Sequence, residues 1–227
     1  PSAVCEGGST INLSDATGGG TWSSSATATA TIDAGGQVTG LTSGTTTITY
    51  TVTATSCYIT TPITVNPLPT SFGGPSAVCV NANITITNAI PGGTWASSNT
   101  AIATISTSGV VTGVSSGSVL ISYTTPVGCM ATTTINVNGV PGSITGSTAV
   151  CQGLTTTLGN SVAGGSWSSS NTAVGTVSAT GVVYGVSGGS TTITYQVTAT
   201  GCMATTAVTV SQSPMISGTY AMCTGTT

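Results

Sequence analysis

Apolar and polar residues alternate along residues 190–200, and this pattern is the clearest local signal in the chain. One set of alternate positions holds Ile193, Tyr195 and Val197, and the other set is mostly threonine: Thr192, Thr194 and Thr198. Successive side chains of a β-strand point to opposite faces of the sheet, so the pattern predicts a strand with one apolar face and one face covered by hydroxyl groups. Six more short strands are predicted around it, at residues 143–151, 154–160, 164–170, 173–178, 181–187 and 202–211. Seven short strands separated by turn residues predict a β-sandwich.

The same arrangement occurs three times, with a period of about 72 residues. Trp22, Trp95 and Trp167 are 73 and 72 positions apart, and the tyrosines and most cysteines keep the same register. The chain is therefore predicted to be all-β, with three tandem sandwich domains of immunoglobulin-like topology. Their expected bounds are 1–66, with a truncated first strand, then 67–138 and 139–211. Residues 212–227 are expected to begin a fourth repeat, as in a window on a longer array, or to be a strand donated to the next subunit.

Two segments resemble a known family. They are "WASSNTAIATISTSGVVTGVSSGSVLISY", Trp95 to Tyr123, and "WSSSNTAVGTVSATGVVYGVSGGSTTITY", Trp167 to Tyr195. Both are similar to the bacterial immunoglobulin-like (group 2) tandem repeats of cell-surface and adhesin-type proteins. The first copy departs from the pattern, because Ala26 stands where the other copies have asparagine. The resemblance implies an Ig-like fold and a place in the stalk or adhesion segment of a bacterial surface protein.

Aromatic residues are few, and six of them sit at repeated positions: Trp22, Trp95, Trp167, Tyr50, Tyr123 and Tyr195. Each tryptophan is separated from a preceding pair of glycines by one residue, as in "GGTW", and this places it on the third strand of its repeat. A domain this small needs large apolar side chains to form a core. We therefore expect the six aromatics to be core residues. The alternative is that the tryptophans are exposed platforms on which sugar rings stack.

Seven cysteines occupy two registers: Cys5, Cys79, Cys151 and Cys223 in the first strand of each repeat, and Cys57, Cys129 and Cys202 in the turn before the last strand. No C-x-x-C motif or histidine accompanies them, so disulfides are expected and a zinc site is not. Bonds within repeats would join Cys5 to Cys57 and its equivalents. Bonds between consecutive repeats would join Cys5 to Cys129 and Cys79 to Cys202, and Cys57 and Cys151 would then bond to partners outside the given sequence. The second scheme is favoured if the two turns lie at opposite ends of the sandwich, and bonds between chains remain a third scheme.

Charge is almost absent, which excludes several functions. The chain has no Lys, Arg or His, and its three acids are Glu6, Asp15 and Asp33. General acid–base catalysis and activation of a nucleophile need ionisable groups that are missing, so no catalytic residue and no enzyme activity are expected. Nucleic-acid binding needs basic residues to neutralise the phosphates, and the chain has none, so no nucleic-acid partner is expected. No cofactor, no metal and no membrane insertion of this segment are expected either.

Two functions remain from the sequence. The first is a structural role: a rigid extracellular stalk or filament on a bacterial surface, whose partner is itself, through neighbouring repeats or identical chains. Disulfides and an oxidising compartment fit this role. The alternative is an adhesin module that recognises a glycan or another cell surface. Its sequence feature would be the first repeat, which alone carries the acids.

Overall fold

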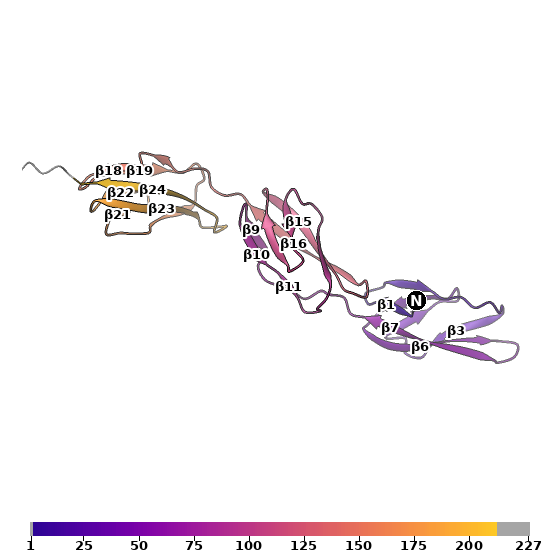
Figure 1. Ribbon diagram of the computed structural model, residues 1–227. Helices are drawn as coiled ribbons and strands as arrows, with labels where there is room; N and C mark the ends of the chain where they lie inside the picture. The colour runs from indigo at the N-terminus through magenta and orange to yellow at the C-terminus, as the bar shows by residue number, and fades with distance from the viewer. Residues whose placement is uncertain (1, 213–227) are drawn as a thin grey trace, which may run out of the picture. The chain divides into compact units, whose positions relative to one another are not determined.

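The computed structural model describes residues 2–212, and every regular element in that part is a β-strand (Figure 1). Cys223 and residues 213–227 lie outside the described residues, so the expected fourth repeat or donated strand is not described. The chain divides into two compact units, Pro1–Val137 and Asn138–Thr227. The described residues contain three separate apolar cores, one for each predicted repeat: two in the first unit and one in the second.

The first repeat consists of two sheets. The larger sheet has the order β1-β7-β6-β3, with β1 (Ala3–Cys5), β7 (Tyr58–Asn66), β6 (Gly44–Val52) and β3 (Gly20–Ser24). The smaller sheet has the order β2-β5-β4, with β2 (Thr10–Asn12), β5 (Gln37–Gly40) and β4 (Ala30–Ile32). All ladders are antiparallel except the pairing of β1 with β7, which is parallel.

The second repeat has the same plan. Its sheet β12-β15-β16-β9 contains β12 (Thr94–Ser97), β15 (Gly117–Thr124), β16 (Met130–Asn138) and β9 (Ala77–Cys79). The sheet β10-β14-β13 contains β10 (Asn83–Thr85), β14 (Val110–Gly113) and β13 (Ala103–Ile105). A separate two-stranded sheet is formed by β8 (Phe72–Gly73) and β11 (Thr87–Asn88).

The third repeat lies in the second unit. The sheet β18-β24-β23-β20 contains β18 (Ala149–Cys151), β24 (Met203–Ser211), β23 (Gly189–Val197) and β20 (Gly165–Ser169). The sheet β17-β19-β22-β21 contains β17 (Thr145–Gly146), β19 (Thr155–Gly159), β22 (Val182–Gly185) and β21 (Gly175–Val177). The sequence predicted one strand over residues 143–151, and this was wrong. The segment forms two strands in different sheets, β17, which pairs with β19, and β18, which pairs with β24. The chain changes direction at Gly146, the last residue of β17, where φ is 109°.

The alternating pattern places the cores as expected. Along β23, Thr191, Ile193 and Tyr195 are buried and Thr192 is exposed. Ile193 is fully buried, as is its equivalent in each of the other repeats, Ile48 and Ile121. A strand with one buried face cannot slip by one residue without exposing its whole apolar set, so the pattern fixes the register of each sheet.

Candidate functional site

Each tryptophan lies directly across the ladder from a tyrosine. Trp22 pairs with Tyr50, and the same register joins Trp95 to Tyr123 and Trp167 to Tyr195. The ring centroids of the three pairs are 4.6, 4.5 and 4.7 Å apart, with tilted planes. Tilted aromatic pairs at this distance add about 0.5–1.5 kcal/mol to the free energy of area burial.

The tyrosine hydroxyl explains the glycines that precede each tryptophan. In the first repeat the Tyr50 hydroxyl donates to the Thr17 carbonyl oxygen at 2.6 Å and accepts from the Gly20 N–H at 3.0 Å. A Cβ atom on Gly20 would lie 2.4 Å from Cζ of the Tyr50 ring. Gly19 has φ = 79°, which glycine adopts without strain. The other repeats have the same two hydrogen bonds. The first glycine of the pair therefore allows the turn, and the second leaves space for the tyrosine ring, whose hydroxyl accepts a hydrogen bond from that glycine.

The six aromatics do not have equal burial. The tyrosines are 4–8% exposed, whereas the tryptophans are half-buried and contact the edge of each core. In the second repeat Phe72 covers Trp95, with ring centroids 6.0 Å apart. In the first repeat Trp22 lines a surface groove of about 170 Å³ together with Asp15 and Ile59. The tryptophans are thus core-edge residues with one accessible side.

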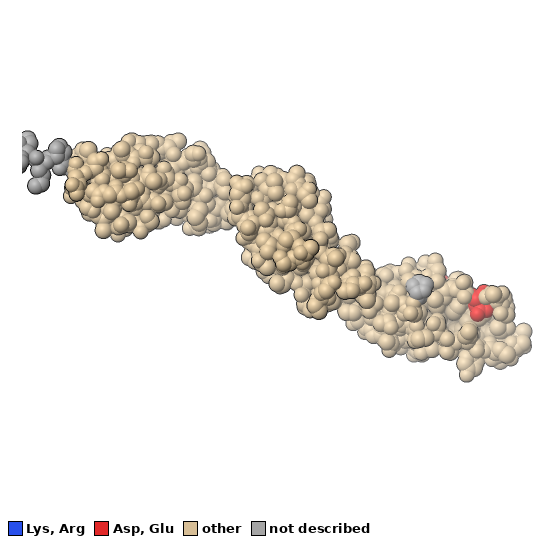
Figure 2. Space-filling model, viewed as in Figure 1, with Lys and Arg blue, Asp and Glu red and all other residues tan. Residues whose placement is uncertain are grey.

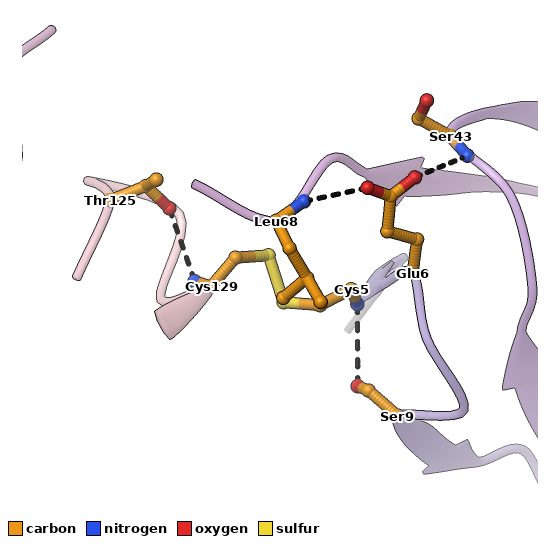
Figure 3. Close-up of a disulfide and its surroundings, with 7 residues drawn as sticks. All are labelled: Cys5, Glu6, Ser9, Ser43, Leu68, Thr125 and Cys129. Atoms are coloured by element: carbon orange, nitrogen blue, oxygen red, sulfur yellow. Dashed lines mark hydrogen bonds between the residues drawn. A yellow bond between two sulfur atoms is a disulfide. The ribbon is translucent and has the colours of Figure 1, made fainter. Parts of the chain in front are cut away.

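The cysteines form a bond between consecutive repeats of the first unit. Cys5 at the end of β1 is joined to Cys129 in the turn between β15 and β16, with their Cα atoms 5.6 Å apart (Figure 3). Cys129 is fully buried, and its N–H donates to the Thr125 hydroxyl at 3.1 Å. Cys79 and Cys202 are also disulfide-bonded. The pairing of those two with each other stays a prediction. Cys57 and Cys151 are free and exposed.

The parallel pairing of β1 explains why Cys5 is not bonded to Cys57. Cys5 lies opposite Asn66, the last residue of β7, whereas Cys57 immediately precedes the first residue of β7. Nine residues of strand separate the two ends, which corresponds to about 30 Å at 3.3 Å per residue. A disulfide needs Cα atoms within about 7 Å. A disulfide between Cys5 and Cys57 within the first repeat is therefore excluded by distance.

A carboxylate supports this junction. Glu6 follows the bonded Cys5, and its two oxygens accept from the Leu68 N–H and the Ser43 N–H, each at 3.0 Å (Figure 3). Leu68 belongs to the segment between the first two repeats, so the Glu6 side chain ties that segment to the first sandwich. Hydrogen bonds to a charged acceptor are about twice as strong as neutral ones. No local sequence pattern predicts this structural role of Glu6, because its two partners are backbone groups that are distant in the sequence.

The other two acids hold turns of their own repeat. One Asp33 oxygen accepts from the N–H groups of Gly35 and Gln37, and Asp15 accepts from the Thr17 N–H. Within residues 2–212 no three His, Cys, Asp or Glu side chains gather into a metal-binding group. In the face drawn in Figure 2 a single small red area of acidic side chain is visible, over the first repeat. No helix in residues 2–212 is long and apolar enough to cross a membrane.

Comparison with known proteins gives a family and a set of similar structures. No curated protein matches the chain. A surface-layer protein, SbsC domains 1–6, has 18% identity, covers 95% of this chain and 40% of its own, and has a TM-score of 0.30. Invasin, a bacterial integrin-binding protein, has 16% identity, covers 92% of this chain and 57% of its own, and has a TM-score of 0.41.

A C-terminal fragment of intimin in complex with the intimin-binding domain of its translocated receptor has 18% identity, covers 59% of each chain and has a TM-score of 0.38. This chain thus spans 40–59% of the length of these three structures. The model of the bacterial Ig-like domain (group 2) family matches residues 9–57 and 59–139. These two ranges hold more than half of the chain, which belongs to the bacterial Ig-like domain (group 2) family.

Proposed function

We propose that this chain is a structural segment of a bacterial surface protein, in which Ig-like repeats joined in series form a rigid extracellular stalk or filament. Three features support a mechanical role. The repeats keep one register over three copies, the segments between them are short, and charged groups are almost absent from the surface. We infer no enzymatic role, because the described residues offer no base to activate a nucleophile.

The Cys5–Cys129 disulfide is the observation that carries the proposal. The bond spans 124 residues and joins the first strand of one repeat to a turn of the next. A bond inside one sandwich would stabilise only that sandwich. A bond between sandwiches restricts their relative motion and transmits tension from one to the next without passing through either hydrophobic core. Disulfides persist in oxidising surroundings, which agrees with a location outside the cytoplasm.

The test is electron microscopy of the native protein under non-reducing conditions, repeated after reduction. The long strands are nine residues, so each repeat should add at least about 30 Å to a particle in which the repeats are joined end to end. Straight rods or fibres that become bent after reduction, or in a Cys5→Ser/Cys129→Ser variant, are the expected result. Rounded particles before reduction would overturn the proposal. The Asp33→Asn variant, whose side chain is remote from the bond in sequence and lies in a turn, is the matched control and should keep straight rods.

A second candidate function is an adhesin module, and the groove beside Trp22 favours it. That groove combines an accessible aromatic ring, the Asp15 carboxylate and the exposed side chain of Ile59. Aromatic faces and carboxylates are groups that can bind a sugar ring and its hydroxyls.

A glycan array probed with the intact chain tests this candidate. Binding that is lost in Asp15→Asn and kept in Asp33→Asn would support it, because the second carboxylate lies in a turn outside the groove. Absence of binding on the array, or equal loss in both variants, would count against it.

A further inference from the structure

The strand β16 of the second repeat has one paired side and one side that is mostly open. Its paired side contacts β15 along the whole ladder from Met130 to Val137. Its other side contacts β9, which has only three residues. The Asn136 N–H donates to the Ser76 carbonyl oxygen at 2.9 Å, at the point where β9 begins to cover β16. Among residues 2–212, nothing pairs with the backbone of β16 on this side before Asn136.

The open side presents three residues with unpaired backbone groups. In an antiparallel ladder, alternate residues point their N–H and C=O groups toward and away from the neighbouring strand. The Asn136 N–H points away from β15, so the residues at every second position before it do the same: Met130, Thr132 and Thr134. Such a row of donors and acceptors is a template for another strand. The second repeat lies between the other two in the chain, so neither end of the sequence creates this edge.

The first repeat shows how such an edge is closed. Proline and charged side chains are the usual protection of an edge strand. Pro62 in β7 has no N–H to donate, and it occupies an outward position two residues before Thr64, whose N–H donates to the Ser2 carbonyl oxygen. Thr134 and Ala207 hold the position of this proline in the second and third repeats, and both keep the donor. Charge protects neither of them, because the three acids of the chain all lie in its first 33 residues.

The second repeat also has an exposed apolar pair beside its open edge. Leu120 is 48% exposed and Met130 is 55% exposed. They lie opposite Thr134 and Thr124 in the ladder of β15 and β16, on the outer face of the sheet. In the third repeat the position of Leu120 is held by Thr192. Exposed large apolar side chains mark surfaces that a partner covers, and among the described repeats only the second combines this pair with a complete row of donors.

We propose that the open edge of β16 pairs with the same edge of a second copy of this chain, in antiparallel orientation about a two-fold axis at Thr132. Thr132 then lies opposite itself, and Met130 lies opposite Thr134 of the second copy. Residues that face each other in an antiparallel ladder exchange both N–H···O bonds, so both copies use the same three residues. In a parallel ladder each residue bonds to the two residues that flank the one opposite, so two identical edges cannot pair symmetrically.

Hydrogen bonds and apolar contact stabilise this pair, and no charge opposes it. The three pairs of facing residues form about six hydrogen bonds, two in each pair. Met130 of the second copy lies two strands away from Leu120, at about 10 Å between Cα atoms, and the two long side chains cover Thr134 between them. Like charges on facing strands are destabilising, and none meet here because the second repeat has no Asp, Glu, Lys, Arg or His.

Self-association of the intact chain is the first test, measured by sedimentation velocity with the disulfides kept and the free thiols blocked by iodoacetamide. A reversible monomer–dimer equilibrium is the expected result. The Thr134→Pro variant should raise the Kd of the dimer by about tenfold or more, because the two-fold axis removes two hydrogen bonds at once. Pro62 shows that a repeat of this fold accepts proline at the same position, and far-UV circular dichroism checks that the variant is folded.

The Ala207→Pro variant is the matched control, because it places proline at the same position of the third repeat. Its dimer should have the Kd of the parent chain. A parent chain that stays monomeric up to about 1 mM would overturn the proposal. A dimer that both variants weaken equally, or that neither variant weakens, would overturn it as well.

Cysteine cross-linking locates the contact. Serine first replaces the cysteines that would compete in the assay: Cys57, Cys151 and Cys223. In this background Thr132→Cys should form a disulfide dimer with oxidised glutathione, since facing residues of a hydrogen-bonded pair have Cα atoms about 5.5 Å apart. Thr205→Cys, the same position of the third repeat, is the control and should stay monomeric. Equal cross-linking of the two variants would overturn the proposal.

A mixture of two further variants determines the orientation. Met130→Cys and Thr134→Cys should cross-link with each other when they are mixed, because these positions face each other in the antiparallel pair. Neither should cross-link with itself, because its own counterpart is four residues along the strand, about 13 Å away. Dimers of either variant alone, in the amount that the mixture gives, would overturn the antiparallel register.

Failure of this inference and failure of the proposed function are distinguishable. The inference goes beyond that function, since a stalk of disulfide-joined repeats does not need lateral contacts. Straight rods in electron microscopy from a chain that stays monomeric in sedimentation would overturn only the lateral contact. Dimers of rounded particles would overturn only the stalk.

Discussion

Mechanical extension of the first unit gives the sharpest test of the junction. While Cys5 and Cys129 are bonded, a pulling force passes through the disulfide, and the segment between them, over a sequence separation of 124, bears no tension. Its ends stay 5.6 Å apart between Cα atoms, whether or not the sandwiches are folded. Without the bond, the same segment can extend to about 410–450 Å, at 3.3–3.6 Å per residue.

The assay is single-molecule force spectroscopy with one handle at the N-terminus and the other on an azide-bearing residue at Val140, which is 46% exposed. This placement keeps the measured segment between Pro1 and Val140. The Cys5→Ser/Cys129→Ser variant should show two unfolding steps of roughly 220–260 Å in contour length, one for each of the sandwiches expected at residues 1–66 and 67–138. The unreduced parent chain should show neither step.

The Cys57→Ser variant is the matched control, because its cysteine is free and exposed, and it should behave as the parent does. Two full unfolding steps in the unreduced parent would refute the reasoning, since the bond would then be absent or would join other residues. A force–extension curve of the Cys5→Ser/Cys129→Ser variant that matches the parent's curve would refute the reasoning equally.

Three further predictions concern the first repeat. Gly20→Ala should lower the free energy of unfolding by about 1–3 kcal/mol, because the new Cβ would overlap the Tyr50 ring, whereas Gly18→Ala, with open space around it, should change it by less than about 0.5 kcal/mol in urea unfolding. Equal effects of the two variants would contradict the account of the glycine pair. Tyr50→Phe should lower the free energy of unfolding by about 1–3 kcal/mol, because the Gly20 N–H and the Thr17 carbonyl oxygen lose their partner. A urea midpoint equal to that of the wild type would contradict this and show that water replaces the hydroxyl. Glu6→Gln should speed hydrogen exchange at the Leu68 amide, measured by NMR, because a charge-assisted hydrogen bond becomes a neutral one, and an unchanged rate would remove Glu6 from the junction.

The tryptophan motif shows how far residue types predict a site. The repetition of "GG" before tryptophan was visible in the sequence, and the large ring was expected in the core. The residue that explains the second glycine, Gly20, is Tyr50, which is thirty positions further along the chain. The Tyr50 ring lies against Gly20 only because β3 and β6 pair in one register. The half-burial of Trp22 depends on which neighbouring segment covers it, and no local pattern contains that information.

The sequence by itself determined the period of the repeat, the all-β class and most strand positions, because alternation, turn residues and register are local properties of the chain. The tertiary structure alone decided the junction. Whether Cys5 meets Cys57 or Cys129 depends on the direction of a three-residue strand, β1, against β7. Parallel pairing puts the two cysteines of one sandwich at opposite ends and leaves the cysteine of the next repeat within bonding distance. Covalent geometry requires a few ångströms between Cα atoms, and only the packed chain sets distances between residues 124 positions apart.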